Sequence, residues 1–389
     1  MIESVATEKD DEKSEWPVGE GEDSVMVELK DLCKKASSNI AQKDLDGHTG
    51  EFPIYGASGL IGYVDFYKQE KPYIAVVKDG AGIGRVMSLP AKSSVIGTMQ
   101  YILPNDDVDA QYLSFAMENM NLAKYFSGAT IPHIYFKDYC TEKLPKHSEK
   151  EQKQISAVLS KVTELISLRK QQLAKLDELV KARFVEMFGD PVYNEMHWET
   201  KRLIDICRTI VDCPHSTPHY TTKDTGYKCI RTSAVKKNKI LWEKVECISK
   251  QEYEERIKRK RPEKGDVIYT REGAILGIAA VIDRDYNVAL GQRSMLLSPD
   301  IYKCTPCFLS MAMNFDSFLG KALGGVSGSA SPHINVGDIK ALEIIAPPIE
   351  IQNQFSTFVE QVDQQKQTVQ ESLKKLELLK KALMQEYFG

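Results

Sequence analysis

The sequence predicts an α+β protein in which two mixed α/β domains are separated by two long helices that form a coiled coil. Three observations predict this class. The 389 residues exceed the usual size of one hydrophobic core. Residues 129–189 align with 329–389 without a gap and share seventeen of sixty-one positions. Each copy ends in a long stretch with apolar residues at heptad spacing. We therefore expect an internal two-fold pseudo-repeat.

The chain opens with an acidic tail, in which residues 1–25 hold nine acidic residues and two lysines. Its apolar content is too low to build a core, so we expect 1–25 to be disordered. The rest carries 46 acidic and 49 basic residues, a net charge of +3 against −4 for the whole chain, which permits a partner with phosphates. Because no run of eighteen apolar residues and no signal peptide are found, we expect a cytoplasmic protein.

The two domains are expected at 26–147 and 191–345, where short β-branched and aromatic runs are bounded by Gly, Pro and Asp. The run K-D-G-A-G-I-G-R-V at 78–86 has the glycines of a nucleotide loop, but such a loop must lead into a helix. The apolar residues that follow predict a strand instead. In the second copy Gly273 and Gly277 match the outer glycines, whereas Ile275 replaces the middle one. The glycines therefore predict a tight turn between strands.

Two long helices are expected within 148–190 and 346–389, each roughly 60 Å long at 1.5 Å per residue. Their narrow apolar stripes favour pairing with each other over packing as separate amphipathic helices. The seam of the first helix is formed by Ile155, Leu159, Val162, Leu173 and Leu176, and that of the second by Phe355, Val362, Leu373 and Leu376.

The order of these motifs resembles that of the DNA-specificity (S) subunits of type I restriction-modification systems, over nearly the whole chain. The first domain contains G-E-F-P-I-Y-G-A-S-G-L-I-G-Y-V-D at 50–65. The second contains V-D-C-P-H-S-T-P-H-Y at 211–220, K-C-I-R-T-S-A-V at 228–235 and K-G-D-V-I-Y-T-R-E-G-A at 264–274. The two helices end in F-G and are preceded by E-K-E-Q-K-Q-I and I-E-I-Q-N-Q-F, and they are similar to that family's spacer regions.

The resemblance implies two target recognition domains, each reading one half of a split asymmetric DNA site, and an antiparallel helix pair that sets the spacer. It implies that methyltransferase (M) subunits carrying S-adenosylmethionine and nuclease/translocase (R) subunits using ATP and Mg²⁺ bind this chain. The chain itself is then expected to hold no cofactor, to catalyse nothing and to bind double-stranded DNA rather than a membrane. Two alternatives stay open, a DNA adenine methyltransferase and a coiled-coil scaffold without a nucleic-acid role.

Side chains that contact DNA are expected on the glycine and proline loops, since Arg, Lys and hydroxyl groups there reach phosphates and base edges. In the first domain the candidates are Tyr55, Ser58, Lys78, Arg85 and His133. In the second they are His215, Ser216, Arg231, Thr232, Ser233, Lys258, Arg259, Arg271 and Arg293. Each can instead be an ordinary solvated residue, or a cap in the case of His133. Because Arg271 stands where the first copy has Lys78, both are expected to face DNA.

A basic run, E-R-I-K-R-K-R-P-E-K at 255–264, carries six basic residues. It is either a solvated face or a phosphate clamp. The tetrapeptide D-P-V-Y at 190–193 is one residue from the D-P-P-Y of adenine amino-methyltransferases. We expect it to be a helix stop, because Gly189 and Pro191 are typical of helix C-termini and the second copy ends at Gly389 without it.

The eight cysteines are scattered in apolar runs, so no disulfides are expected. Cys304 and Cys307 have metal-like spacing, but no second C-x-x-C completes a zinc site. Cys213 with His215 and His219 lacks a fourth ligand. We therefore predict no metal in this chain.

Overall fold

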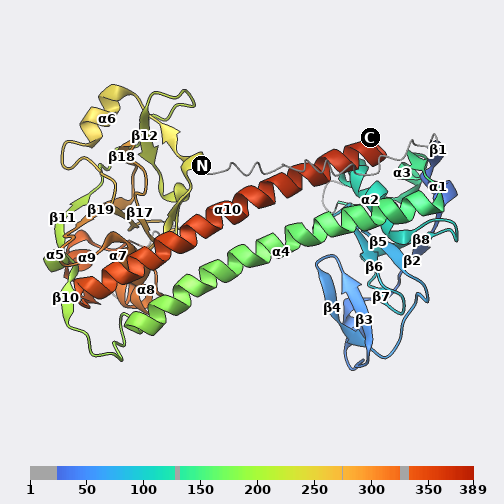
Figure 1. Ribbon diagram of the computed structural model, residues 1–389, viewed down its shortest axis with the longest axis horizontal. Helices are drawn as coiled ribbons and strands as arrows, with labels where there is room; N and C mark the ends of the chain where they lie inside the picture. The colour runs from blue at the N-terminus through green and yellow to red at the C-terminus, as the bar shows by residue number, and fades with distance from the viewer. Residues whose placement is uncertain (1–23, 128–131, 274, 325–332) are drawn as a thin grey trace, which may run out of the picture. The chain divides into compact units, whose positions relative to one another are not determined.

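The computed structural model describes residues 24–127, 132–273, 275–324 and 333–389. The chain forms two units, Met1–Lys170 with Ser372–Gly389 (unit 1) and Gln171–Glu371 (unit 2). Each unit contains one mixed α/β domain and part of two 40-residue helices (Figure 1). The predicted disordered tail lies outside the described residues except for its last two residues. Among the described residues, no helix is long and apolar enough to cross a membrane.

Unit 1 is built on a four-stranded antiparallel sheet with the order β2-β8-β5-β6. Its central strand reads Y-I-A-V-V and is buried throughout, as expected for a β-branched strand covered on both faces. Helix α2 packs on this sheet, and the carboxylate of Asp109 caps it by accepting a hydrogen bond from Tyr112 N at 2.8 Å. A smaller sheet has the order β4-β3-β7, and β1 pairs with β9.

The elements of unit 1 have the following bounds: β1 Val25–Glu28, α1 Leu29–Leu32, β2 Cys33–Ser37, η1 Gln42–Leu45, β3 Phe52–Gly56, β4 Gly59–Val64, β5 Tyr73–Val77, β6 Val86–Leu89, β7 Ser94–Val95, β8 Met99–Pro104, α2 Ala110–Asn119, η2 Leu122–Tyr125, α3 Phe136–Tyr139 and β9 Lys143–Lys146. Strand β1 begins one residue inside the range predicted to be disordered, because it pairs in register with β9.

Unit 2 repeats this plan with a four-stranded sheet of order β11-β19-β16-β17 and a three-stranded sheet of order β15-β12-β18. Its elements are β10 Thr200–Arg202, α5 Leu203–Ile206, β11 Cys207–Asp212, β12 Tyr227–Ile230, η3 Thr232–Ala234, β13 Val235–Lys236, β14 Lys239–Ile240, η4 Trp242–Lys244, β15 Glu246–Cys247, α6 Lys250–Arg256, β16 Val267–Thr270, β17 Ala279–Val281, β18 Asn287–Leu290, β19 Ser294–Pro299, α7 Pro306–Met313, α8 Asp316–Leu323, α9 Val336–Ala341 and β20 Glu343–Ile345.

The pseudo-repeat is confirmed by strand pairing. Strands β3 and β7 pair in parallel in unit 1, and β12 and β18 do so in unit 2. The terminal pairs β1–β9 and β10–β20 are both antiparallel. Unit 2 differs mainly by what it inserts between β12 and β16, which includes the hairpin β13–β14 and helix α6.

The long helices are α4, Glu149–Phe188, and α10, Ile349–Phe388. Helix α4 begins with a capping box, in which Ser148 Oγ accepts from Glu151 N and the Glu151 carboxylate accepts from Ser148 N. An ion pair joins Lys170 to Glu377 at 3.2 Å in unit 1, and another joins Asp177 to Lys366 at 2.8 Å in unit 2. From the first ion pair to the second, the residue number rises along α4 from 170 to 177 and falls along α10 from 377 to 366. The two helices are therefore antiparallel, as predicted.

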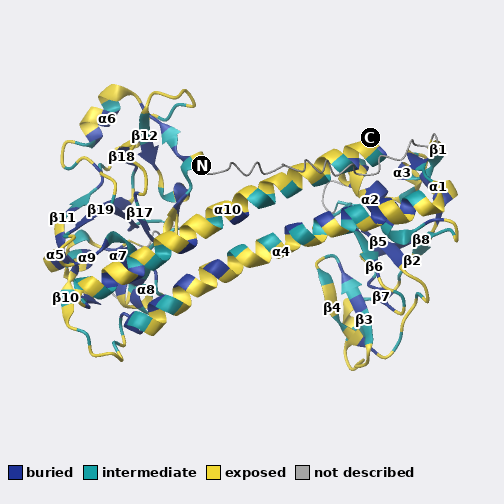
Figure 2. Ribbon diagram, in the orientation of Figure 1, coloured by how far each residue is buried: buried dark blue, intermediate teal, exposed yellow. Residues whose placement is uncertain are grey.

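The apolar stripe of these helices completes the core of each domain. In unit 1, Ile155 and Leu159 of α4 and Phe388 of α10 join the core beneath α2. In unit 2, Phe184 and Phe355 lie with ring centroids 5.4 Å apart in the core. Of the predicted seam, Leu173, Leu373 and Leu376 are half-buried, and the buried members are Ile155, Leu159, Val162, Leu176, Phe355 and Val362 (Figure 2).

One buried glutamine anchors the start of each long helix, at equivalent positions of the repeat. Gln152 Oε1 accepts from Asp109 N at 2.8 Å, and its Nε2 donates to the carbonyls of His147 at 2.9 Å and Asp107 at 3.3 Å. Gln352 Oε1 accepts from Thr305 N at 2.9 Å, and its Nε2 donates to the carbonyls of residues 347 and 303 at 2.8 and 3.1 Å. Each amide therefore ties the helix to the loop before α2 or α7.

Candidate nucleic-acid interface

The glycine turn of unit 1 connects β5 to β6. Gly80, Gly82 and Gly84 all have positive φ, at 79°, 86° and 80°, a region that favours glycine. Gly84 N donates to Val77 O at 2.9 Å, and a Cβ on Gly84 would lie 2.5 Å from Ala123 N. Strand β6 follows the turn, which confirms the predicted strand turn and leaves no helix N-terminus for a nucleotide phosphate.

Unit 2 forms the same turn between β16 and β17 with two glycines. Gly273 and Gly277 have φ of 88° and 73°, and Gly277 N donates to Thr270 O at 2.7 Å. A Cβ on Gly277 would lie 2.1 Å from Cδ1 of Leu319. The outer glycines are therefore the ones that the turn requires, as predicted.

Matching backbone hydrogen bonds gather three segments at this end of each sheet. In unit 1, Lys78 N donates to Thr98 O and Lys78 O accepts from Ile134 N, both at 3.0 Å. In unit 2, Arg271 N donates to Arg293 O and Arg271 O accepts from Ile334 N, also at 3.0 Å. Arg271 is thus the structural counterpart of Lys78, as the alignment predicted.

The five candidates of unit 1 lie around this turn. Arg85 is exposed and donates to the Ala57 carbonyl at 2.7 Å, which links the turn to the β3–β4 hairpin. On that hairpin Tyr55 is half-buried, burial and the neighbouring Tyr63 raise its pKa, and Ser58 is exposed. The Lys78 ammonium lies 3.7 Å from the Asp79 carboxylate.

His133 shares that carboxylate. Its Nδ1 pairs with Oδ1 of Asp79, and its ring lies 4.1 Å from the ring of Tyr135. The pair holds His133 against the glycine turn, and the choice between a DNA contact and a capping role stays open. Lys78, Arg85, Ser58 and His133 together surround one end of the domain.

Arg271 in unit 2 departs from the expectation. Its side chain is only 7% exposed, and its Nε and Nη2 bind the two carboxylate oxygens of Asp212 at 2.8 and 3.1 Å. A third nitrogen, Nη1, lies 2.8 Å from Glu272 Oε1. The expectation that this side chain faces DNA is not met in the free chain, because its fork is held by two carboxylates inside the domain.

Arg293 is the exposed basic residue beside this turn. It adopts φ of 69°, and its Nη1 would lie 3.4 Å from a Cβ on Gly273. Among the described residues, no hydrogen bond or ion pair of its side chain is found. Its guanidinium is therefore available to an external acceptor, unlike that of Arg271.

The remaining candidates of unit 2 lie on the loop from 213 to 226 and around it. His215 Nε2 lies 3.1 Å from Asp212 Oδ2, and the exposed Ser216 accepts hydrogen bonds from Arg256. Arg231 stacks on Tyr220 with its guanidinium carbon 3.9 Å from the ring centroid and pairs with Glu246 at 2.7 Å. Two candidates lie in the short helix η3, where Thr232 is half-buried and Ser233 is exposed.

Half of the basic residues in the run 255–264 are ion-paired. Lys258 pairs with Glu255, Lys260 lies 3.0 Å from Glu263, and Arg256 is buried. Arg259 is exposed and donates to Asp212 O at 3.4 Å. Whether the run is a solvated face or a phosphate clamp stays a prediction.

Comparison with known proteins decides the family. The model of the type I restriction modification DNA specificity domain matches residues 21–178 and 195–378. The chain belongs to this family. It carries two DNA specificity domains, and the fold and the role as a DNA specificity subunit expected from the resemblance are confirmed. The readings as a methyltransferase or as a scaffold without a nucleic-acid role find no support in the match.

Two relatives are specificity subunits of Methanocaldococcus jannaschii. The type I restriction enzyme MjaVIII specificity subunit is 24% identical over 331 residues, which cover 80% of this chain and 77% of the relative. The type I restriction enzyme MjaIX specificity subunit is 23% identical over 283 residues, which cover 67% of this chain and 63% of the relative.

Two solved structures share the fold. The type I restriction-modification S subunit from M. genitalium has a TM-score of 0.63 at 14% identity, covering 96% of this chain and 98% of that one. A chain from a structure that addresses complex assembly and conformational transition of the type I R-M system has a TM-score of 0.51 at 16% identity, covering 94% and 97%.

The D-P-V-Y segment of this specificity subunit is a turn. Gly189 has φ of 71° after α4, and Asp190 Oδ1 accepts from Val192 N, Tyr193 N and Ser317 Oγ at 2.8 to 3.1 Å. The carboxylate is thereby used within the domain, as the helix-stop interpretation expects.

The cysteine groups also serve the fold. Burial raises the pKa of the Cys307 thiol to about 12 and that of Cys304 well above its usual value, so neither is a thiolate at neutral pH. Cys213 is buried whereas the His219 side chain is 97% exposed. Among the described residues, no group of side chains able to hold a metal ion is found.

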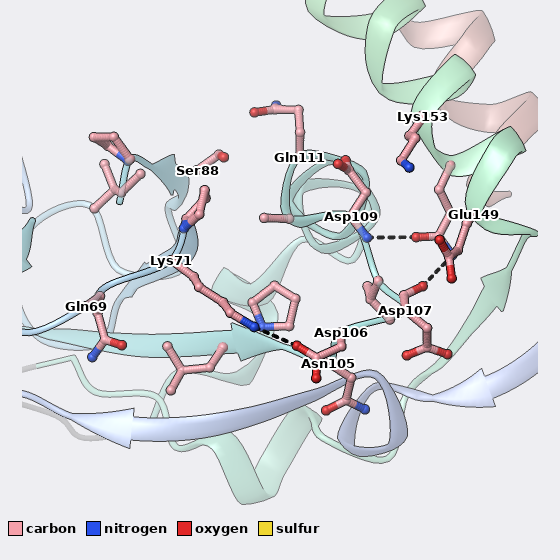
Figure 3. Close-up of a pocket in the computed structure, with 18 of the residues that line it drawn as sticks. Gln69, Lys71, Ser88, Asn105, Asp106, Asp107, Asp109, Gln111, Glu149 and Lys153 are labelled. Atoms are coloured by element: carbon pink, nitrogen blue, oxygen red, sulfur yellow. Dashed lines mark hydrogen bonds and ion pairs between the residues drawn. The ribbon is translucent and has the colours of Figure 1, made fainter. Parts of the chain in front are cut away.

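A groove of about 870 Å³ lies in unit 1 beside the starts of α2 and α4 (Figure 3). Two of its lining residues form an ion pair, since Lys71 lies 2.7 Å from Asp106, and the lining residue Asp107 pairs with Lys146 outside the groove. Gln152 also lines it. We assign it no ligand.

Sequence reasoning missed the residues that hold the loops. Four of them are buried or nearly so, namely Gln152, Gln352, Asp212 and Arg256. Apart from local contacts, they bond to partners 34 or more residues away. One signal was available: Gln152 and Gln352 are identical in the two copies of the repeat, at positions where the neighbouring residues differ.

Proposed function

We propose that this chain is the specificity subunit of a type I restriction-modification complex in which each unit reads one half of a bipartite, asymmetric DNA site. The observation that carries the proposal is the pair of family domains with the same loop framework. In each domain a glycine turn follows a strand, and its first residue is bonded to Thr98 or Arg293 and to the isoleucine at 134 or 334. The exposed side chains on that framework differ between the units, which suits two unlike half-sites.

In this proposal the paired helices set the spacer between the half-sites and form a scaffold for two methyltransferase subunits. Nuclease/translocase subunits complete the complex. S-adenosylmethionine is carried by the methyltransferase subunits, and ATP with Mg²⁺ by the nuclease subunits. The chain contributes DNA recognition and no catalytic group, which agrees with the internal use of the Asp190 carboxylate.

The DNA contacts are proposed to come from the exposed candidates. Arg85 and Ser58 in unit 1 and Arg293 and His215 in unit 2 offer guanidinium, hydroxyl and imidazole groups at the ends of the sheets. Arginine forks suit guanine edges and phosphates alike. The side chains of Lys78 and His133 are engaged with Asp79, so they contribute less.

Exchange of one domain tests the proposal. Residues 26–147 are replaced by the equivalent part of a relative, the chain is expressed with its methyltransferase subunits, and methylated adenines are mapped in cellular DNA. One half-site should change and the other should stay. If both half-sites change together, or if no bipartite site is methylated, the two-reader model is wrong.

A further inference from the structure

Arg256, at the end of α6, is a buried arginine, with a side chain only 2% exposed. Its Nη2 donates to the Ser216 carbonyl at 2.6 Å and to Ser216 Oγ at 3.3 Å, and its Nη1 donates to the Leu290 carbonyl at 3.1 Å. The guanidinium thus fastens the loop between β11 and β12 to the end of β18.

Glu252, one turn earlier on α6, holds the same loop at a second point. Both oxygens of its carboxylate accept from His219 N, at 3.0 and 3.1 Å. Its Oε1 also lies 3.5 Å from Arg256 Nε, so the two side chains form an ion pair beneath the loop. Helix α6 therefore fixes the backbone at Ser216 and at His219 at once.

Two histidines of this loop keep their side chains exposed. The side chains of His215 and His219 are 66% and 97% exposed, while the carbonyl of His215 accepts from the Gln292 amide. A loop of fourteen residues between Asp212 and Tyr227 would otherwise sample many conformations. Fixing its backbone in the free protein removes that entropy cost from binding and gives each side chain one position.

A buried ion pair is weak support for stability, because apolar side chains of similar volume serve a core as well or better. It does define geometry, since a planar fork bonds only to acceptors at fixed positions. Among the described residues of unit 1, no Arg, Lys, Asp or Glu is fully buried. The buried arginine and its ion pair with Glu252 therefore have no counterpart among the described residues of unit 1. The half-site read by unit 1 serves as an internal control.

We propose that Arg256 and Glu252 are positioning residues for base selection by unit 2, holding the 213–220 segment in the conformation that reads its half-site. This inference rests on the proposed function. Neither side chain is itself a DNA contact, because the guanidinium lies beneath the loop.

The test compares Arg256→Lys, Glu252→Gln and the control Lys250→Ala in the full chain with its methyltransferase subunits. Lys250 lies on the same helix, is exposed and faces Glu254 at 3.9 Å. The half-site of unit 2 is first identified as the one that changes when residues 191–345 are exchanged. Methylated-base sequencing then measures base discrimination at both half-sites, and hydrogen exchange measures the protection of the β16 and β19 amides.

For Arg256→Lys and Glu252→Gln we expect discrimination at the half-site of unit 2 to fall on the order of tenfold, the effect of about one lost base contact. The half-site of unit 1 should stay as in the wild type, as should both half-sites for Lys250→Ala. Protection of β16 and β19 should not change. If Arg256→Lys prevents folding of unit 2, Glu252→Gln decides by the same criteria, since it keeps an oxygen for His219 N.

The inference is overturned if the folded variants keep full discrimination at both half-sites, or if methylation falls equally at all sequences. Failure of the proposed function looks different, because the exchange of 191–345 in the wild-type background would then leave the methylated sequence unchanged.

Discussion

The buried glutamines at the starts of the long helices give a prediction whose magnitude follows from the structure. Replacing Gln352 by leucine keeps the volume of the side chain but removes three hydrogen bonds. The Thr305 amide and the carbonyls of residues 303 and 347 then lose their partner, two of these bonds being fully buried. At about 1 to 3 kcal/mol for each unsatisfied buried group, offset by the apolar replacement, we expect a loss of about 3 kcal/mol.

The equivalent change in unit 1 should cost less. The partners of Gln152 are the Asp109 amide and the carbonyls of Asp107 and His147, and all three bonds are partly buried, so water reaches part of what is left. We expect about 2 kcal/mol for Gln152→Leu. For a unit near 200 residues, the larger loss corresponds to roughly 6 to 12 °C in melting temperature.

Each variant has a matched control two residues along the helix from the anchor. Gln154 and Gln354 are exposed members of the same motifs, and their replacement by leucine should change stability by less than about 0.5 kcal/mol. Hydrogen exchange during urea titration measures the free energy of unfolding of each unit separately. Peptides covering 107–112 report on unit 1, and those covering 303–308 report on unit 2. Equal effects of Gln352→Leu and Gln354→Leu, or an effect of Gln352→Leu on the peptides of unit 1 alone, would refute the assignment of these amides as anchors.

Three further predictions follow from single features of the structure. Arg271→Ala should destabilise unit 2 by about 3 kcal/mol in urea titrations, because the Asp212 carboxylate, only 15% exposed, loses both bonds from the guanidinium and keeps only the exposed His215 at 3.1 Å. Arg293→Ala should leave stability unchanged and lower the salt slope of DNA binding by about one charge. Burial lowers the pKa of His147 below 6.5, so the folded state favours the neutral ring; unit 1 should lose stability as pH falls below about 6.5, and His147→Asn should remove that slope in pH-dependent unfolding. Duplicating 173–179 adds one heptad, about 10 Å, and should lengthen the methylated site's spacer by up to about three base pairs with both half-sites unchanged.

The long helices could be predicted to within three residues at each end because their signals are local. Heptad spacing repeats over forty residues, and Ser148 and Glu151 form a capping box that fixes where α4 begins. The glycine turns could be predicted as well. Gly84 and Gly277 adopt a positive φ and a close contact with neighbouring atoms that residues with a side chain do not tolerate. Both features depend on few residues close in sequence.

Whether a charged side chain is buried, paired or exposed could not be predicted in the same way. Arg271 matches Lys78 in the alignment, yet its environment is set by Asp212, 59 residues away. Arg256 stands in a basic run that favours a solvated face, and only the fold brings Ser216 and Leu290 to it. A run of charged residues in the sequence shows only which residue types are present. The burial and pairing of their side chains depend on contacts with residues distant in sequence.

The two copies of the repeat differ in a way that bears on how such a chain acquires a new DNA sequence to read. Gln152 and Gln352 hold equivalent loops by equivalent bonds, and the glycine turns are closed by the same backbone pairing. At the ends of the same framework, Thr98 in unit 1 is replaced by Arg293 in unit 2, and unit 2 alone adds α6 and its ion pair. The two units thus share the bonds that hold their loops, while the side chains that the loops expose differ.

A framework whose stability comes from buried amides and backbone pairing tolerates changes at its exposed tips, since exposed substitutions rarely cost much free energy. Recognition can therefore change in one unit without loss of its fold and without effect on the other.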